Sequence, residues 1–542
     1  MRLPTLLLAV GLIAGPLAAA DRYMVATRSA PRSTQIRMIR ESGEFRSHAV
    51  RAFDTVDAFA ADLTADEVAA LRRSSEVRFV TLTVERYALG DLHPVSDGSP
   101  YLTAQTIPPG IPMIHAPELW PFTKGAPINV AVIDTGIDTR HPDLAANYAG
   151  GYNTFDQSDD PTDDNGHGTH VAGTIAAVDN NIGVVGVAPE ARIWSVKALD
   201  RGGVGVDENI VSAVDWVIKK KRAIGGDWIM SLSLGATISS PVEEEAFKRV
   251  IAEGVIVVAA AGNRGFSDVE FPAGYPGVIA VGAVDSTAKL AGFSDHGPHL
   301  SVVAPGVHVL STARTGSISS AGVTLPSGTD ITAAAITGSS RGEVAASYVA
   351  CGLGRPEEFP DSVRGKIALI KRGEITFNEK VRNAQAAGAL SVVIYNKDES
   401  DFKLWTLLRP DCGAIDGCDD PTHPWPVVLA VSNTDGQRLL DDAAQQMDMG
   451  SWLDDYMYLN GTSMACPHVS GALALIWSLA PEASPARVRD ALFGTAVDLG
   501  APGFDEMYGF GMVNAYAAGV RIAPKRFRAR SEPPDFDRRS PP

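Results

Sequence analysis

From residue 129 onward the sequence alternates short apolar runs with amphipathic segments, and this alternation restricts the fold more than any other feature. The apolar runs have the length and composition of buried strands and cover residues 130–133, 193–198, 229–234, 255–260 and 278–284. The segments between them have helical periodicity, as in the apolar face at positions 210, 214, 217 and 218. A capping box from Ser240 to Glu243 predicts the start of another helix. Strands that alternate with helices predict a three-layer α/β domain, in which helices cover both faces of a parallel sheet.

The alternation stops at about residue 316 and resumes after about residue 455. Residues 316–449 contain strands of their own and one clear helix, which begins at the capping box Thr376–Glu379 and ends at Gly388. We therefore predict a small, β-rich α/β domain inserted into the larger domain, which comprises residues 104–315 and 450–523. Residues 524–542 are rich in Arg, Pro and Ser, a composition that predicts disorder.

The N-terminal part has a different composition. Residues 1–20 combine Arg2, an apolar run at 6–13 and a small-residue end at 18–20, which is typical of a signal peptide. The run is too short to span a bilayer, so secretion is expected rather than membrane anchoring. Residues 22–88 predict an α+β unit with strands at 23–26, 58–61 and 77–84 and a capped helix at 64–73. A linker at 89–103 follows.

Charge and cysteine content restrict the partners and the redox chemistry. The 542 residues carry a formal net charge of −17, which argues against nucleic acid or an anionic membrane surface as partner. The excess of carboxylates fits a soluble protein that binds divalent cations. In a secreted protein, Cys412 and Cys418 are close enough in sequence for a local disulfide. Cys351 and Cys466 complete a set of four, and the sequence does not choose among the three full pairings.

Three motifs carry candidate catalytic groups. Asp134 ends the strand-like run 130–133, His167 begins a helix of small residues, and Ser463 enters a helix at its N-terminus. Each motif alone is weak, because Asp and Ser commonly cap loops and helices. His167 and His170 have the spacing of a metal-binding pair, but no third ligand is placed nearby. The order Asp, His, Ser is nevertheless one of the orders known for the serine-hydrolase triad.

With these motifs, residues 104–314 and 452–520 resemble the subtilase (subtilisin-like) serine protease family. The resemblance implies a triad in which His167 is the base for Ser463 and Asp134 orients the imidazole. It also implies that Asn263, after the apolar run 257–261, donates to the oxyanion. His170 and His468 match the structural histidines of the family.

Substrate-binding residues follow from the same resemblance. Ser233, Leu234 and Gly235 match the family segment that pairs with an extended peptide. The segment 259–262, with Ala260 and Gly262, would form the other wall of the pocket for the residue before the cut. Glu270 would lie at the base of that pocket and favour Lys or Arg there. The alternative for Glu270 is a solvated loop carboxylate.

Calcium is the expected cofactor, because the segment 178–184 resembles the calcium loop of the family. By that resemblance the ligands are two side-chain amides, one carboxylate and three backbone carbonyls, from Gln105, Asp143, Val178, Asn180, Ile182 and Val184. A second acidic run at 156–164 could hold another ion or be a solvated loop, and the sequence does not decide.

The flanking units also resemble known modules. Residues 22–88 resemble the inhibitor-type propeptide, which the enzyme would cut off itself between about residues 86 and 104. The insert resembles the protease-associated domain at 365–373, in its helix and at 392–396, and is expected to steer substrates without a catalytic group.

The overall expectation is a secreted, extracellular or periplasmic, monomeric serine endopeptidase. It would act on proteins or peptides through an acyl-enzyme and bind its own propeptide as inhibitor. The alternative is a catalytically silent binding protein on a subtilase scaffold, which the presence of all four catalytic residues argues against. An esterase or peptide ligase would use the same triad.

Overall fold

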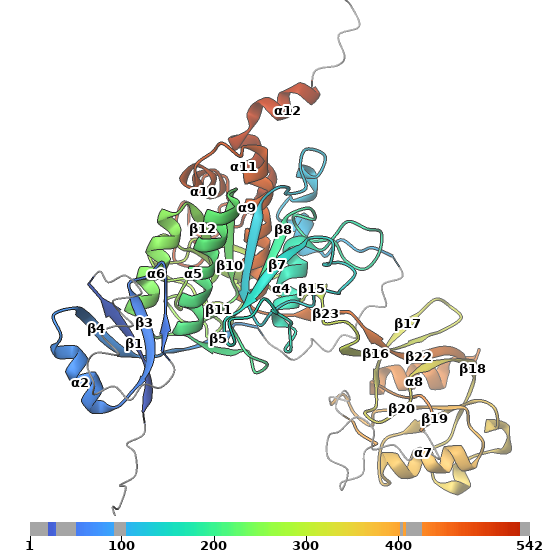
Figure 1. The fold of residues 1–542 in the computed structure, drawn as a ribbon. Helices are drawn as coiled ribbons and strands as arrows, with labels where there is room; N and C mark the ends of the chain where they lie inside the picture. Colours follow the sequence, from blue (N-terminus) through green and yellow to red (C-terminus); the bar gives the residue numbers. More distant parts are fainter. Residues whose placement is uncertain (1–19, 29–49, 91–103, 401–404, 408–424, 532–542) are drawn as a thin grey trace, which may run out of the picture.

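The computed structural model describes residues 20–28, 50–90, 104–400, 405–407 and 425–531 (Figure 1). The predicted signal peptide, Cys412, Cys418 and most of the predicted linker lie outside these residues.

A seven-stranded sheet forms the centre of the main domain, and every adjacent pair in it is parallel. In spatial order its strands are β14 (Val302–Pro305), β13 (Ile279–Val284), β12 (Val255–Ala260), β10 (Trp228–Leu232), β6 (Asn129–Asp134), β8 (Arg192–Lys197) and β7 (Tyr148–Asn153). The predicted parallel sheet is therefore confirmed, with β7 and β14 added at its edges.

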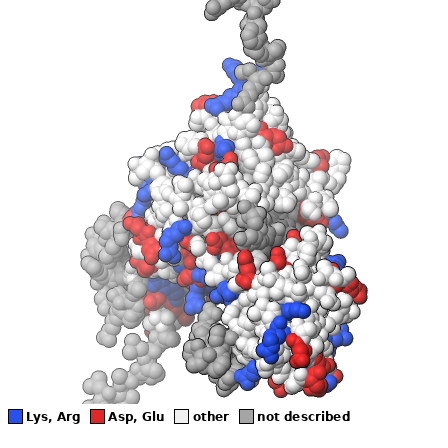
Figure 2. All heavy atoms as spheres, turned by 90° about the vertical axis from the view of Figure 1, so that its right-hand side faces the viewer, with Lys and Arg blue, Asp and Glu red and all other residues white. Residues whose placement is uncertain are grey.

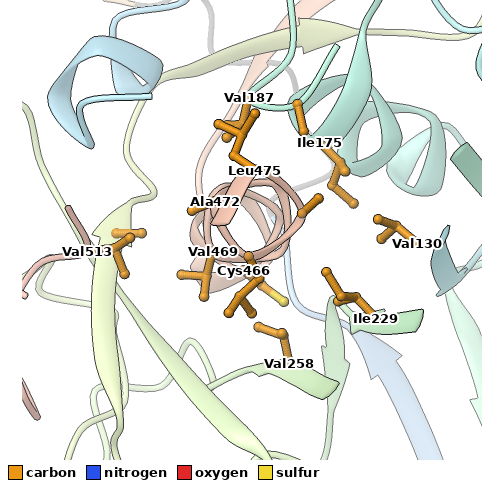
Figure 3. Close-up of a cluster of buried hydrophobic side chains, with 14 of the residues drawn as sticks. Val130, Ile175, Val187, Ile229, Val258, Cys466, Val469, Ala472, Leu475 and Val513 are labelled. Atoms are coloured by element: carbon orange, nitrogen blue, oxygen red, sulfur yellow. The ribbon is translucent and has the colours of Figure 1, made fainter. Parts of the chain in front are cut away.

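Helices cover both faces of this sheet, and successive residues of β6 point to opposite faces. Val130 and Val132 pack in the core that contains α4 (His167–Ala176) and α9 (Thr462–Leu479). Ala131 and Ile133 pack in the core that contains α5 (Asp207–Ile224) and α6 (Pro241–Ala252). Figure 3 shows α9 surrounded by apolar side chains from the sheet, from α4 and from Val513.

In its described residues, the N-terminal unit is a four-stranded antiparallel sheet with one helix. It consists of β1 (Asp21–Thr27), β2 (Arg51–Ala52), β3 (Ala58–Leu63), α2 (Ala65–Arg73) and β4 (Val77–Leu82), with strand order β2-β3-β1-β4. The predicted capping box between Thr64 and Glu67 is present. One face of this sheet buries Met24, Ala58 and Ala60 in the core that contains α5 and α6, so the unit is docked on the main domain.

The insert is a closed barrel with two helices, and it lies to one side of the parallel sheet (Figure 1). Its elements are β16 (Ile318–Thr324), β17 (Asp330–Ala335), β18 (Gly342–Ala350), β19 (Ile367–Lys371), α7 (Phe377–Ala386), β20 (Ser391–Tyr395), β21 (Val428–Val431), α8 (Asn433–Asp441) and β22 (Gln446–Asp454). The predicted boundary at residue 449 falls within β22, because this strand pairs with β16 as far as Asp454. The prediction included α7 with its capping box but missed α8.

The insert is connected to the main domain through the antiparallel pair β15 (Val309–Thr312) and β23 (Tyr456–Leu459). Cys351 within the insert and Cys466 in α9 are both buried and unpaired.

The C-terminal part forms three helices: α10 (Pro485–Phe493), α11 (Ala515–Ile522) and α12 (Pro524–Ser531). The prediction of disorder from residue 524 onward is therefore wrong for the first residues of the tail. Phe527 packs against Phe122, with ring centroids 4.3 Å apart, and this contact anchors an otherwise polar segment. Across the described part of the chain, no helix is both long and apolar enough to cross a bilayer.

Candidate active site

A short three-stranded sheet joins the N-terminal unit to the edge of the main domain. β5 (Glu85–Ala88) runs antiparallel between β9 (Val204–Val206) and β11 (Leu234–Gly235). The sequence predicted one strand at 77–84, whereas β4 ends at Leu82 and the chain then enters this second sheet. A segment of the N-terminal unit thus lies as an added strand between two edges of the main domain.

The three candidate catalytic residues meet at one end of the parallel sheet. Asp134 is the last residue of β6, His167 the first of α4 and Ser463 the second of α9. Nδ1 of His167 lies 2.7 Å from Oδ1 of Asp134, and both side chains are buried. Nε2 of His167 has no hydrogen-bond partner within the described residues. The Ser463 hydroxyl donates to the carbonyl oxygen of Ser233 at 2.9 Å.

The backbone at Leu89 lies directly across this group. Its carbonyl oxygen accepts hydrogen bonds from Nδ2 of Asn263 at 2.6 Å and from the backbone N–H of Ser463 at 3.2 Å. Its own N–H donates to the carbonyl oxygen of Ser233 at 3.1 Å. The next residue, Gly90, approaches the base so closely that a Cβ there would lie 2.9 Å from Nε2 of His167. The Leu89–Gly90 peptide bond is therefore held between the nucleophile, the base and two hydrogen-bond donors.

Asn263 is fixed by a second set of contacts. Its Oδ1 accepts from both the backbone N–H and the hydroxyl of Thr462, each at 2.9 Å. These two bonds orient the amide so that its NH₂ group points to the Leu89 carbonyl. The donors are placed as an oxyanion hole requires, and the catalytic role of Asn263 stays a prediction.

Asp163, at the end of the acidic run 156–164, anchors the start of the helix that carries His167. Its carboxylate accepts from the hydroxyls of Thr135 and Thr169 and from the backbone N–H groups of Asn165, Gly166 and Thr169. The sequence left this run open as an ion site or a solvated loop. For Asp163 the observed role is different, because the carboxylate is buried and fully used by hydrogen bonds.

His170 and His468 are buried and point away from the triad. Nε2 of His170 lies 3.0 Å from the carbonyl oxygen of Val309, and Nδ1 of His468 lies 2.8 Å from that of Met464. Burial lowers the pKa of His170 to about 3 and that of His468 to about 4, so both are neutral near pH 7. The metal alternative for His170 gains no support, because the described ranges contain no group of three His, Cys, Asp or Glu placed to hold an ion.

The predicted substrate-binding residues surround Leu89. Leu234 and Gly235 pair with β5, and a side chain on Gly235 would lie 2.8 Å from both Cδ1 of Leu89 and Oε2 of Glu270. Glu270 is 2% exposed, which excludes the solvated-loop alternative. It forms an ion pair with Nε of Arg264 at 2.9 Å. Burial raises the pKa of Glu270, and the charge of Arg264 opposes that rise.

The segment 259–262 lies beside Glu270, because a Cβ placed on Gly262 would be 2.9 Å from Cγ of Glu270. Ala260 is the last residue of β12, and the backbone N–H of Gly262 donates to the Thr462 hydroxyl at 3.2 Å. A side chain on Gly262 would collide with the carboxylate of Asp295, and the backbone there has a φ of +126°, so the position requires glycine.

The predicted calcium ligands also lie together. Nδ2 of Asn180 donates to Oδ1 of Asp143 at 2.9 Å, and Nε2 of Gln105 donates to the carbonyl oxygen of Val178 at 3.0 Å. Oδ2 of Asp143 accepts from the backbone N–H of Val184 and from the hydroxyl of Tyr456. Tyr456 was not predicted, because it comes from β23, beyond the insert.

A capping prediction at α6 is only half correct. Ser240 caps the helix by accepting from the backbone N–H of Glu243 at 3.4 Å. The carboxylate of Glu243 does not return to the cap, because it pairs with Arg86 of β5 at 2.5 Å. No local pattern in the sequence indicates this partner, which is 157 positions away.

Comparisons with known proteins agree with this geometry. The model of the Subtilase family matches residues 125–346, and that of the PA domain matches residues 340–439. A thermostable alkaline protease of Halalkalibacterium halodurans is 36% identical over 306 residues, which are 55% of this chain and 77% of the relative. Subtilisin DY of Bacillus licheniformis is 44% identical over 214 residues, which are 39% of this chain and 76% of the relative.

A solved structure extends the similarity beyond the catalytic domain. The crystal structure of the psychrophilic subtilisin-like protease Apa1 from Pseudoalteromonas sp. AS-11 superposes with a TM-score of 0.53 at 31% identity. It covers 78% of this chain and 99% of its own. The fold and the arrangement around Ser463 are consistent with these relatives. The chain therefore belongs to the subtilase family of serine proteases, with a PA domain inserted into its catalytic domain.

Proposed function

We propose that this subtilisin-like serine protease is made as an inhibited precursor that hydrolyses its own Leu89–Gly90 bond and then acts as a secreted endopeptidase. The observation that carries the proposal is the position of the Leu89 carbonyl oxygen, which accepts hydrogen bonds from Asn263 and from the backbone of Ser463. These are the donors that a developing oxyanion needs.

The first half of the reaction transfers the acyl group to the enzyme. The Ser463 hydroxyl turns from the Ser233 carbonyl toward Nε2 of His167, which takes its proton while Oγ attacks the carbonyl carbon of Leu89. The buried carboxylate of Asp134 holds Nδ1–H and stabilises the imidazolium that forms. Negative charge moves to the carbonyl oxygen, where Asn263 and the Ser463 N–H stabilise it.

The second half releases both products. His167 returns its proton to the nitrogen of Gly90, the C–N bond breaks, and the segment that starts at Gly90 leaves as a free amine. Water then gives a proton to His167 and attacks the acyl-enzyme, so that Leu89 ends as a free carboxylate and Ser463 regains its proton. The bond is internal to the chain, which supports endopeptidase rather than exopeptidase action.

The N-terminal unit is suited to inhibit the enzyme after the cut. Ion pairs connect it to α5 and α6: Arg22 with Glu208, Lys219 with Asp54, Arg78 with Glu245 and Arg249 with Asp57. Together with the buried apolar face and the pairing of β5, they can hold the cleaved segment in the cleft. We propose that release of this propeptide controls the onset of activity.

We propose that calcium stabilises the fold, and the residues present fit such an ion. Side-chain oxygens from Gln105, Asp143 and Asn180 and carbonyl oxygens from Val178, Ile182 and Val184 give the all-oxygen donor set that calcium prefers. The first four of these residues already contact one another in pairs. Bound calcium would supply a structural link between the loop and Asp143, with no part in the chemical step.

The insert is proposed to steer protein substrates. The two segments that connect the insert to the main domain pass close to Gly166, the residue before His167. A Cβ placed on Gly166 would lie within 4.0 Å of Cγ of Arg314 and of Cε of Met457, one from each segment. Figure 2 shows acidic and basic side chains intermixed on the face that includes the insert. A surface on which both charges are intermixed is suited to neutral as well as charged polypeptides. We propose that the enzyme acts on them as a monomer.

The experiment that tests the proposal compares the intact masses of wild type and Ser463→Ala, both expressed with residues 1–20. We expect the variant to be secreted with its N-terminus near Asp21, and wild type to separate into fragments that end at Leu89 and begin at Gly90. A wild-type chain that stays uncut while it hydrolyses other proteins would contradict self-processing. A wild type that does neither would contradict the proposed enzyme altogether.

A further inference from the structure

In β5 the charged side chain of Arg86 is buried, whereas the aromatic side chain next to it is exposed. Tyr87 is 38% exposed, whereas Arg86 beside it has no exposed surface. We propose that Arg86 occupies an arginine-specific subsite, so that the enzyme prefers polypeptides with Arg three residues before the residue whose carbonyl is attacked. This inference rests on the proposed function, because it takes the Leu89–Gly90 bond as the bond that is cut.

The pocket gives the guanidinium a bidentate partner. Nε and Nη2 of Arg86 donate to Oε1 and Oε2 of Glu243 at 3.1 and 2.5 Å, and neither side chain has exposed surface. Two parallel hydrogen bonds of this kind match the planar fork of Arg and not the single ammonium of Lys. The geometry therefore selects for Arg rather than for any cation.

The acidic side of the pocket is built from the main domain alone. Glu243 lies in the first turn of α6, where the free N–H groups of the helix favour a carboxylate. The hydroxyl of Tyr275 lies 2.8 Å from Oε2 of Glu243 and accepts from the backbone N–H of Ser240 at 2.8 Å. These contacts involve no residue of the N-terminal unit, so the carboxylate stays in place when the propeptide leaves.

A second buried carboxylate makes an uncharged occupant still less favourable. Asp207, the first residue of α5, is fully buried and accepts from the backbone N–H of Val84 at 3.2 Å. The pKa of Asp207 is raised to about 6, chiefly by burial and also by the charge of Glu243, while Arg86 opposes this rise. With a neutral side chain in place of Arg86, Glu243 would be buried without a compensating charge, which is strongly unfavourable.

The position of Arg86 is also the position of a substrate side chain. β5 is held by backbone pairing to β9 and β11, which any extended peptide can make. The same pairing brings the carbonyl of Leu89 to Asn263, a requirement for every substrate. A residue three positions before the one whose carbonyl is attacked must therefore direct its side chain toward Glu243, whether it belongs to the propeptide or to a substrate.

The test uses the full-length wild-type enzyme after the segment that ends at Leu89 has been released. Its substrates are acetylated peptides with the sequence Glu-Xaa-Tyr-Ala-Leu-Gly-Ser, in which Xaa is Arg, Lys, citrulline or norleucine. Citrulline keeps the shape of Arg without its charge. We expect kcat/KM for Arg to exceed that for citrulline and norleucine by about 30-fold or more, as for loss of one partner of a buried charge pair, with Lys between them.

Two variants assign the preference to the pocket. Glu243→Gln should lower kcat/KM for the Arg peptide to that of the citrulline peptide, so that the ratio between the two substrates falls to about one. Glu244→Gln is the matched control, because Glu244 is the next residue of α6 and pairs with Lys248 at the surface, so the Arg preference should persist. Equal rates for all four peptides with wild type, or an Arg preference that survives Glu243→Gln, would overturn the inference.

The proposed function is judged separately in the same assay. Hydrolysis of the norleucine peptide by wild type and not by Ser463→Ala supports the protease whatever the effect of Arg. If Glu243→Gln does not fold, the wild-type peptide series decides the question alone.

Discussion

Nδ2 of Asn263 lies 2.6 Å from the carbonyl oxygen of Leu89, and the other end of the same amide is held by Thr462. The donor is thus oriented before any charge develops, which is the condition for strong stabilisation of an oxyanion. Because its partner belongs to the chain itself, the contribution of Asn263 can be measured on self-processing without an added substrate.

We expect Asn263→Ala to slow self-cleavage by about 10²- to 10³-fold, which is the known cost of removing this donor from subtilisin. The Ser463 N–H would remain as the second donor, so cleavage should continue slowly at the same bond. The rate is measured by the loss of precursor mass over time. Cleavage at the wild-type rate would show that Asn263 does not stabilise the transition state.

Asp134→Asn tests the orientation of the base. An amide in place of the carboxylate favours the wrong tautomer of His167, and the same change in a chymotrypsin-type triad lowers kcat by about 10⁴-fold. We expect a precursor that keeps its N-terminal unit and unfolds at the same temperature as Ser463→Ala. If the variant cleaves itself at a rate close to that of wild type, Asp134 is not the residue that orients the imidazole.

The positions of the three candidate catalytic residues at the ends of their elements could be predicted from the sequence because the signals are local. Asp134 ends an apolar strand, and His167 and Ser463 begin helices in short motifs of small residues. The capping box at Thr64 was confirmed for the same reason, since both of its partners lie within one turn. Where the structure depends on neighbours in sequence, the pattern was sufficient.

Contacts between distant residues could not be predicted in this way. Glu243 has the sequence position of a capping-box glutamate, yet an arginine from the N-terminal unit provides a stronger partner for its carboxylate. Arg264 and Glu270 are close in sequence, but both lie outside regular elements, so no periodicity indicates that they pair. The helix at 524–531 was missed because composition suggested disorder, whereas one aromatic residue, Phe527, docks on Phe122.

Removal of calcium should lower stability more than activity. If the ion binds as proposed, free calcium at 100 times its Kd adds about 2.7 kcal/mol to the free energy of unfolding, and a chelator should remove this gain. The measurement is thermal unfolding of Ser463→Ala with calcium and with chelator. Asp143→Asn should abolish the difference, whereas Asp160→Asn in the exposed part of the acidic run should preserve it. An unfolding temperature that is the same with calcium and with chelator would contradict the proposed calcium site.

The cleaved propeptide should bind the enzyme more tightly in acid. Asp207 is buried in the docked precursor, and this burial is the chief reason that its pKa there is raised from 3.8 to about 6. If release of the segment that contacts it through Val84 exposes the carboxylate, the docked state binds more protons between these values. This contribution is complete below about pH 4 and is lost as the pH rises through 6. We expect about 10-fold tighter binding at about pH 5 than at about pH 7.5.

The pH effect is measured as the appearance of activity after processing, with samples incubated at the two pH values and assayed at one common pH. Asp207→Asn, which cannot titrate, should release the propeptide at similar rates at both. If wild type releases it faster in acid, the burial of Asp207 does not control release.

The last prediction concerns the residue before the cut. The carboxylate of Glu270 and the side chain of Leu89 approach the same Gly235, so a Lys or Arg in place of Leu89 would place its cation near Glu270. Arg264 already pairs with this carboxylate, but it is half exposed and solvent weakens the pair.

We therefore expect peptides with Lys or Arg before the cut to be better substrates than those with Ala. Glu270→Gln should remove that advantage, and Arg264→Gln should increase it by about 5-fold or less. Peptides that keep Arg in the pocket of Glu243 and vary only this residue give the kcat/KM values. Should Ala be preferred over Lys and Arg in all three enzymes, Glu270 would have no part in substrate selection, and its charge would serve only to hold Arg264 at the edge of the pocket.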